Sequence, residues 1–168
     1  MVDGERAEAR QWRMIIIAMT EIHFYHLQRQ PLEAVLPTLI EKSLGRGWRA
    51  VVQATSAERL AALDDHLWTF SDDSFLVHAT DNEPDAADQP VVLTLAESNP
   101  NRAAIRFLVE GAPLPAEVSG YERLVVVFDG NDEEALAAAR AHWKAVKAAG
   151  HEATYWQQDP RGRWEKKG

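Results

Sequence analysis

The chain has 168 residues, a length typical of one domain, and 46% of them are hydrophobic, which is enough for a sizeable core. It contains no cysteine, which excludes disulfides and thiolate metal sites, and its formal net charge is -8. An acidic chain repels the phosphate backbone unless it carries a local basic patch, so we expect a protein partner and no direct nucleic-acid binding. The longest early apolar run, residues 14–19, is too short to span a bilayer or to form a secretory signal. We therefore expect a cytoplasmic protein without membrane contact.

The first 18 residues differ in composition from the rest of the chain. Residues 2–13 are largely polar and charged, whereas Trp12 and residues 15–17 are apolar. Three interpretations of this N-terminal extension stay open: a start codon placed upstream of the native one, a disordered segment, or an added element of the fold. We expect the folded domain to span residues 19–158, and we expect the polar tail 159–168 to fray.

The first half of the domain alternates between short apolar runs and helical periodicity. Apolar residues recur at steps of three and four across residues 32–44, which gives one apolar helix face. Pro31 suits the first turn of that helix, and Gly45 or Gly47 suits its end. Pro37 either kinks the helix or marks its true start. The expected elements are a strand at 20–25, a helix at 31–44, a strand at 48–54, and a helix from an N-cap at Ser56 to about Trp68.

The second half repeats this alternation and contains the most apolar strand of the chain, with aliphatic residues at 124–127. Asn131 is expected to cap the last helix, and Gly150 is expected to end it. The expected elements are a short strand or extended link at 75–77, a loop at 81–88, strands at 90–95, 103–109 and 121–128, a helix at 131–149, and a strand at 153–157. Strands that alternate with amphipathic helices indicate a single three-layer α/β/α domain with a mostly parallel sheet.

The sequence lacks the motifs of nucleotide and hydrolase chemistry. The glycines at 45 and 47 are not followed by the Lys-Ser/Thr of a Walker A loop, and neither a Gly-x-Gly-x-x-Gly nor a Gly-x-Ser-x-Gly motif occurs. His23 and His26 are three apart on a strand, so we expect them on opposite faces rather than on one metal. We therefore expect no catalytic residue, no metal and no cofactor. The alternative is a small α/β enzyme whose unrecognised nucleotide or phosphate site lies near residues 129–131, because ligands of such folds bind at the carboxyl ends of strands.

The last predicted helix carries a cluster of cations and one aromatic residue. Steps of three and four bring four residues to one side of this helix: Arg140, Trp143, Lys144 and Lys147. One interpretation is structural, because cations near a helix C-terminus are favoured by the helix dipole alone. The other is a shallow pocket with an aromatic floor and a cationic rim, which would bind an acidic peptide that ends in an apolar side chain and a carboxylate.

A second aromatic group follows the second predicted helix and consists of Trp68, Phe70 and Phe75. Burial in the core is the usual fate of such residues. Because Trp68 lies at a helix end beside a polar turn, an interface role is the alternative.

Several short segments, in this order, resemble the chi subunit family of bacterial DNA polymerase III. The resemblance covers about residues 19–156, and no single segment is highly specific, but the ordered set is fairly so. The segments are residues 22–27 (IHFYHL), 64–68 (DDHLW) with 74–78 (SFLVH), 99–101 (NPN), 128–131 (FDGN), and 140–144 (RAHWK) with Lys147 and Gly150.

The resemblance implies a Rossmann-like α/β/α fold without nucleotide chemistry. It implies an adaptor that joins the clamp loader through the psi subunit, and that binds the acidic C-terminal tail of single-stranded DNA-binding protein (SSB). A repair helicase is a further possible partner. The family's tail pocket uses an Arg, an aromatic residue and a Lys on the last helix, which correspond to Arg140, Trp143 and Lys144 here. Two positions depart from the family: Trp143 stands where Tyr is more frequent, and Val77 stands where the family has Pro.

Overall fold

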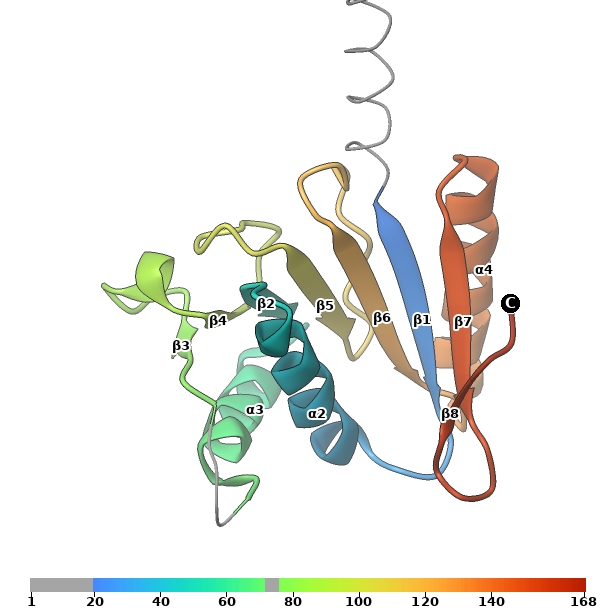
Figure 1. Cartoon of the computed structure of the whole chain (residues 1–168), viewed down its shortest axis with the longest axis horizontal. Helices are drawn as coiled ribbons and strands as arrows, with labels where there is room; N and C mark the ends of the chain where they lie inside the picture. The colour runs from blue at the N-terminus through green and yellow to red at the C-terminus, as the bar shows by residue number, and fades with distance from the viewer. Residues whose placement is uncertain (1–19, 72–75) are drawn as a thin grey trace, which may run out of the picture.

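The computed structural model of the protein describes residues 20–71 and 76–168. Its sheet contains eight strands in the order β3-β4-β2-β5-β6-β1-β7-β8, and all neighbouring strands are parallel except β7 and β8 (Figure 1). The strands are β1 (Glu21–Leu27), β2 (Ala50–Gln53), β3 (Ala79–Thr80), β4 (Val91–Thr94), β5 (Ile105–Val109), β6 (Arg123–Asp129), β7 (Ala153–Gln158) and β8 (Trp164–Lys166). The helices are α2 (Leu32–Gly45), α3 (Ala57–Thr69), α4 (Glu133–Ala148) and a short 3-10 turn at Ala86–Asp88.

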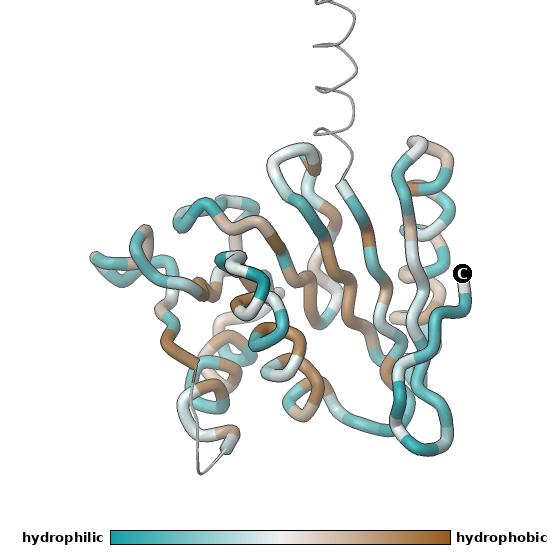
Figure 2. Tube along the Cα trace, viewed as in Figure 1, coloured by the Kyte–Doolittle hydropathy of each residue, from teal (hydrophilic) through white to brown (hydrophobic). Residues whose placement is uncertain are grey.

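Two hydrophobic clusters fill the space between the helices and the sheet. One cluster joins α2 and α3 to one face of the sheet, and the other joins α4 to the opposite face. Figure 2 shows the hydrophobic residues along β5 and β6 and on the sides of α2 and α3 that face the sheet. This arrangement confirms the predicted three-layer α/β fold and its mostly parallel sheet.

Helix α2 continues through Pro37 without interruption. Proline has no N–H to donate to the carbonyl four residues earlier, which belongs to Glu33. Here Nε2 of His66 on α3 donates to that carbonyl at 2.6 Å, so the oxygen keeps a partner. Gly47, with φ +83°, ends the helix as its N–H donates to the Leu44 carbonyl at 2.9 Å.

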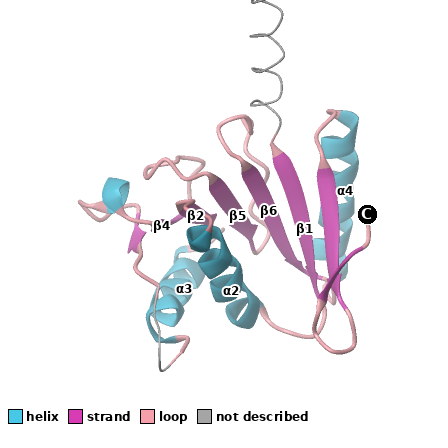
Figure 3. Cartoon of the chain, in the orientation of Figure 1, coloured by secondary structure: helices cyan, strands magenta, loops and turns pink. Residues whose placement is uncertain are grey.

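The two faces of β1 and β7 differ in their surroundings because α2 covers only part of one face of the sheet. α2 packs against β2 and β6, and α3 packs against β4, whereas neither helix lies over the same face of β1 and β7 (Figure 3). That face carries His23, Tyr25, Trp156 and Trp164, whose rings contact one another. The opposite face of the same strands is covered by α4, and His26 points to that side, toward Tyr155 and Phe128. The prediction that His23 and His26 lie on opposite faces is therefore confirmed.

Two local predictions were wrong. Residues 159–168 were expected to fray, but Trp164–Lys166 form β8 and pair antiparallel with β7. The N-cap of α4 is Asp132 rather than Asn131, since the Asp132 carboxylate accepts from the N–H groups of Glu134 and Ala135. Of the short strand or extended link expected at 75–77, residue 75 lies outside the described residues, residues 76–77 belong to no strand, and the neighbouring strand β3 begins at Ala79.

The extension 1–18 and residues 72–75 lie outside the described residues. Within the described part, no helix is long and apolar enough to cross a membrane.

Candidate partner-binding surface on the last helix

Helix α4 is fixed at both ends by local interactions and rests on the sheet through small side chains. Asp132 caps its N-terminus, and Gly150, with φ +85°, ends it as its N–H donates to the Lys147 carbonyl at 3.1 Å. Ala139 and Val146 are buried against β6 and β7. Because these side chains are short, the helix lies close to the sheet, and its larger residues are left at the margin of the contact.

Trp143 lies at that margin, with one part of its indole packed and another accessible. Its ring meets the edge of Phe24 at 5.4 Å and of Tyr155 at 5.8 Å between centroids. The side chain is partly buried rather than sealed in the core. The Lys147 ammonium lies 5.4 Å from the centre of the same ring, which is within the range of a cation–π contact. Part of the indole is therefore accessible beside a lysine of the same helix.

The three cations of α4 lie on the exposed side of the helix, to one side of this ring. Arg140, Lys144 and Lys147 are all exposed. Successive residues turn by about 100° around a helix, so the three lie within about 60° of one another, next to Trp143. The structure thus brings together all four residues that the sequence placed on one side of the helix.

Two residues near Arg140, His26 and Tyr155, were not assigned to this surface from the sequence. The Tyr155 hydroxyl lies 2.6 Å from Nδ1 of His26. Burial lowers the pKa of His26, and the charge of Arg140 lowers it further. The pKa of Tyr155 is raised by burial, although the charge of Arg140 opposes this change. Arg140 is therefore close enough to act on both rings, and strand alternation at 153–157 could have placed Tyr155 on the α4 side.

The residues that follow β8 cover part of Trp143. The Lys167 N–H donates to the Tyr155 carbonyl at 2.7 Å, and the Tyr155 N–H donates to the Gly168 carbonyl at 3.3 Å. A Cβ at Gly168 would lie 3.3 Å from two carbons of the indole. A peptide that binds at Trp143 would therefore meet the backbone of this segment as well as the three cations.

The second predicted interface is partly described. The Trp68 side chain at the end of α3 is 43% exposed, and its ring lies 4.4 Å from that of the buried His78. Phe70 is partly buried against the core beneath α3, and Phe75 lies outside the described residues. Val77, which is 49% exposed, adds an apolar side chain that the sequence reasoning did not include.

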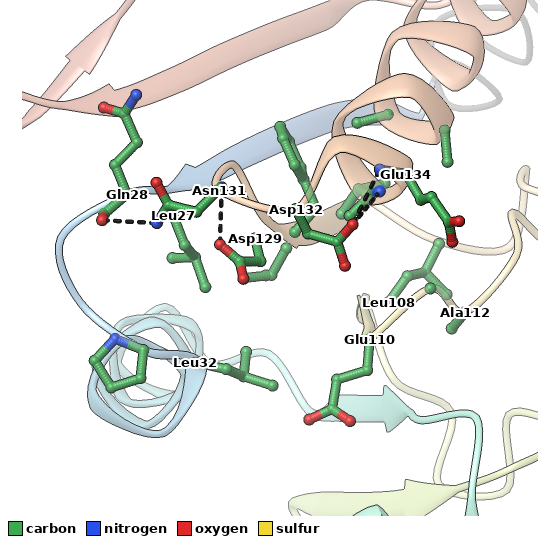
Figure 4. A pocket seen from close by; sticks show the side chains of 18 of the residues that line it. Leu27, Gln28, Leu32, Leu108, Glu110, Ala112, Asp129, Asn131, Asp132 and Glu134 are labelled. Atoms are coloured by element: carbon green, nitrogen blue, oxygen red, sulfur yellow. Dashed lines mark hydrogen bonds between the residues drawn. The ribbon is translucent and has the colours of Figure 1, made fainter.

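A large hollow lies elsewhere, at the carboxyl ends of β1, β5 and β6, and has a volume of about 770 Å³ (Figure 4). This is the place where an α/β enzyme would bind a nucleotide. However, the N-terminus of α4 is already occupied by the Asp132 carboxylate, as Figure 4 shows. Five carboxylates line the hollow: Glu33, Glu110, Asp129, Asp132 and Glu134. Such a lining repels phosphate, so the geometry disfavours the alternative of a nucleotide or phosphate enzyme.

Among the described residues, no group of three or more His, Asp or Glu side chains is arranged to hold a metal ion.

Two comparisons with known proteins identify the family of this chain. The chain is similar to the probable DNA polymerase III subunit chi of Rickettsia prowazekii, with 24% identity over 117 residues, which cover 66% of this chain and 71% of that protein. Residues 19–154, most of the chain, match the family described as DNA polymerase III chi subunit. The chain therefore belongs to the DNA polymerase III chi subunit family.

Proposed function

We propose that the chain is a non-catalytic accessory subunit of the bacterial DNA polymerase III assembly, and that the α4 surface binds the acidic C-terminal tail of SSB. Family membership supports the role in replication. The observation that carries the tail site is the accessible indole of Trp143 beside three exposed cations, with the Lys147 ammonium 5.4 Å from the ring. The protein would act in the cytoplasm as an adaptor and would contribute no chemistry of its own.

The proposed binding mode uses each residue in a different way. Arg140 and Lys144 pair with the terminal carboxylate and the preceding acids of the tail. The apolar last side chain of the tail packs on the exposed part of Trp143. Because the cations are exposed, each ion pair is weak, so the ring and the cations must act together.

A titration of the full chain with a fluorescent SSB tail peptide tests this proposal. We expect Lys144→Ala or Arg140→Ala to weaken binding about fivefold to tenfold, since one charge-assisted contact is lost. Trp143→Leu should abolish measurable binding, whereas Trp143→Tyr should retain most of it because the ring is kept.

Lys42→Ala is a matched control, because Lys42 is also an exposed lysine near the end of a helix but lies on α2. Equal affinity for the wild type, Arg140→Ala and Lys144→Ala would remove the proposed pocket.

We further propose that Trp68, Phe70 and Phe75 belong to a second interface, toward the psi subunit or another clamp-loader component. The supporting observation is the exposure of Trp68, whose ring contacts His78, and of Val77, which precedes His78 in the chain. The same surface would serve if the partner were a repair helicase. Pull-down from a cell extract with the wild type and with Trp68→Glu tests this. We expect the wild type to recover clamp-loader proteins that the variant does not recover. Recovery of those proteins by both would exclude the surface.

A further inference from the structure

A second hollow, of about 320 Å³, lies on the face of the sheet opposite to α4, beside the C-terminal end of α2. Its lining differs in charge from that of the larger hollow. Lys42, Arg46 and Arg123 line it, and none of its described lining residues is a carboxylate. In a chain of net charge -8, this is a local basic patch of the kind that would permit contact with phosphate.

The same hollow has aromatic walls. Tyr25 and Trp156 are register partners on β1 and β7, and their rings are stacked, with centroids 6.0 Å apart and planes 16° apart. The ring of Trp164 on β8 meets Tyr25 edge to face at 4.9 Å. Nε1–H of Trp156 donates to Nδ1 of His23 at 3.1 Å, which fixes the orientation of the indole. Tyr25, Trp156 and Trp164 are only partly buried, so part of each ring is accessible.

The charges around these rings are held in place. Arg123 donates to the Glu21 carboxylate at 2.8 and 3.1 Å, and its guanidinium lies 5.2 Å from the centre of the Trp48 ring. Arg46 lies 5.3 Å from the same ring. Trp48 therefore holds two guanidinium groups at the edge of the hollow, and Glu21 neutralises only one of them.

We propose that this surface, formed by Tyr25, Trp156 and Trp164 with Lys42, Arg46 and Arg123, binds single-stranded nucleic acid. Aromatic rings for stacking beside a cationic rim are the two components of sites that bind single strands without sequence preference. A volume of about 320 Å³ is at the small end of ligand sites, so the hollow seats one base with its phosphate rather than a duplex.

An acidic peptide would satisfy the cations, but the single apolar side chain at its end would cover only part of the three adjacent rings, whereas a flat base can stack on them, so the rings favour a nucleic acid. The earlier expectation of no nucleic-acid contact rested on net charge alone, which does not describe this face. The inference is independent of the proposed tail site, because the two surfaces lie on opposite sides of the sheet.

The test is fluorescence anisotropy of a labelled oligothymidylate titrated with the full chain, at several salt concentrations. We expect saturable binding and quenching of tryptophan fluorescence. Lys42→Ala/Arg46→Ala should weaken binding about tenfold and reduce the slope of log K against log salt by about 1.4, since each phosphate contact to a single strand contributes about 0.7. Trp156→Leu should weaken binding, whereas Trp156→Phe should retain it, since a ring is kept.

The matched control is Lys144→Ala/Lys147→Ala, which removes the same charge from the end of α4. This variant should lose the SSB tail peptide and keep the oligonucleotide, and Lys42→Ala/Arg46→Ala should do the reverse. Oligouridylate and a duplex serve as further probes: either single strand supports the proposal, and equal binding of the duplex overturns it. It is also overturned if the oligonucleotide does not bind, if Lys42→Ala/Arg46→Ala binds it as the wild type does, or if only a polyglutamate peptide binds this face.

Discussion

At the centre of the sheet, the Arg106 side chain on β5 is completely buried, and its hydrogen-bond partners are neutral groups. Its guanidinium donates to Oε1 of Gln53 at 2.7 and 3.1 Å, to the Ser98 carbonyl at 2.9 Å and to the Tyr121 hydroxyl at 3.0 Å. It also donates to the Ala96 carbonyl. The forked geometry of one guanidinium thus joins β2, β5 and the loop after β4.

Arg106→Ala should lower the free energy of unfolding by about 3 kcal/mol or more, because several buried acceptors lose their donor at once. Arg106→Lys should not restore it, since an ammonium cannot reproduce the planar fork. Urea denaturation followed by circular dichroism measures the effect. A loss below about 1 kcal/mol for Arg106→Ala would mean that water or neighbouring groups replace the guanidinium.

His23 is a second buried polar residue, and its environment predicts a pH dependence of stability. Burial and, second to it, the charge of Arg123 lower its pKa from 6.5 to about 4. The hydrogen bond that its Nδ1 accepts from Trp156 also requires the neutral ring. Between pH 6.5 and 4 the unfolded chain therefore binds a proton that the folded chain excludes, so stability falls as the pH falls through this window.

The contribution of His23 to this loss is about 3 kcal/mol between pH 7 and pH 4. Urea midpoints measured across this range should fall less steeply for His23→Gln than for the wild type. Parallel pH profiles for the two proteins would show that His23 does not titrate in this way.

At the scale of elements, the first turn of α2 is held by two side chains of α3. His66 donates to the Glu33 carbonyl that Pro37 leaves without a helical partner, and the Arg59 guanidinium contacts the Glu33 carboxylate at 2.6 Å. Arg59 also pairs with Glu110 after β5, with nitrogen–oxygen distances of 2.7 to 2.9 Å. Pro37 is therefore tolerated inside α2 because α3 supplies the missing donor.

His66→Ala should destabilise the protein by about 1 kcal/mol, since the Glu33 carbonyl loses its donor. The cost should be smaller in a Pro37→Ala background, because the new N–H at position 37 can donate to that carbonyl. Thermal or urea unfolding of the two single variants and the double variant gives this coupling. If His66→Ala lowered the free energy of unfolding equally in both backgrounds, His66 would not replace the N–H that Pro37 lacks.

The elements that the sequence predicted well are those with a strong local pattern. Burial explains these patterns, because buried positions are filled by apolar residues that can be read in the sequence. Examples are the apolar runs of β4, β5 and β6 and the periodicity of α2 and α4. Strands β3 and β8 have two and three residues, and no periodicity can be read from so few positions. They form because an existing strand offers a free edge, which is a tertiary effect.

The candidate site was predictable only in part, for a similar reason. Helical spacing alone brought Arg140, Trp143, Lys144 and Lys147 together. Phe24 and Tyr155, which support the indole, come from β1 and β7, and their proximity depends on strand order. The burial of Arg106 could not be predicted from the sequence, because an arginine within an apolar strand is ordinarily expected to face solvent.

At the scale of the whole molecule, charge is distributed unevenly, and this affects how an acidic tail would bind. The net charge of -8 repels such a tail at long range, while the cations of α4 attract it at short range. Added salt screens both effects. We therefore expect salt to weaken binding of the SSB tail peptide mainly through faster dissociation, with little change in the association rate. Stopped-flow fluorescence at several salt concentrations separates the two rates, and a steep fall in the association rate would indicate attraction at long range instead.

The shortness of the outermost strands has a consequence for crowded assemblies. A long, flat edge strand exposes a row of backbone donors and acceptors to which another chain can add. Here the sheet ends in strands of two and three residues, and β8 carries the charged residues Glu165 and Lys166. Many copies of this chain can thus be concentrated in one place without their sheets joining edge to edge into fibres.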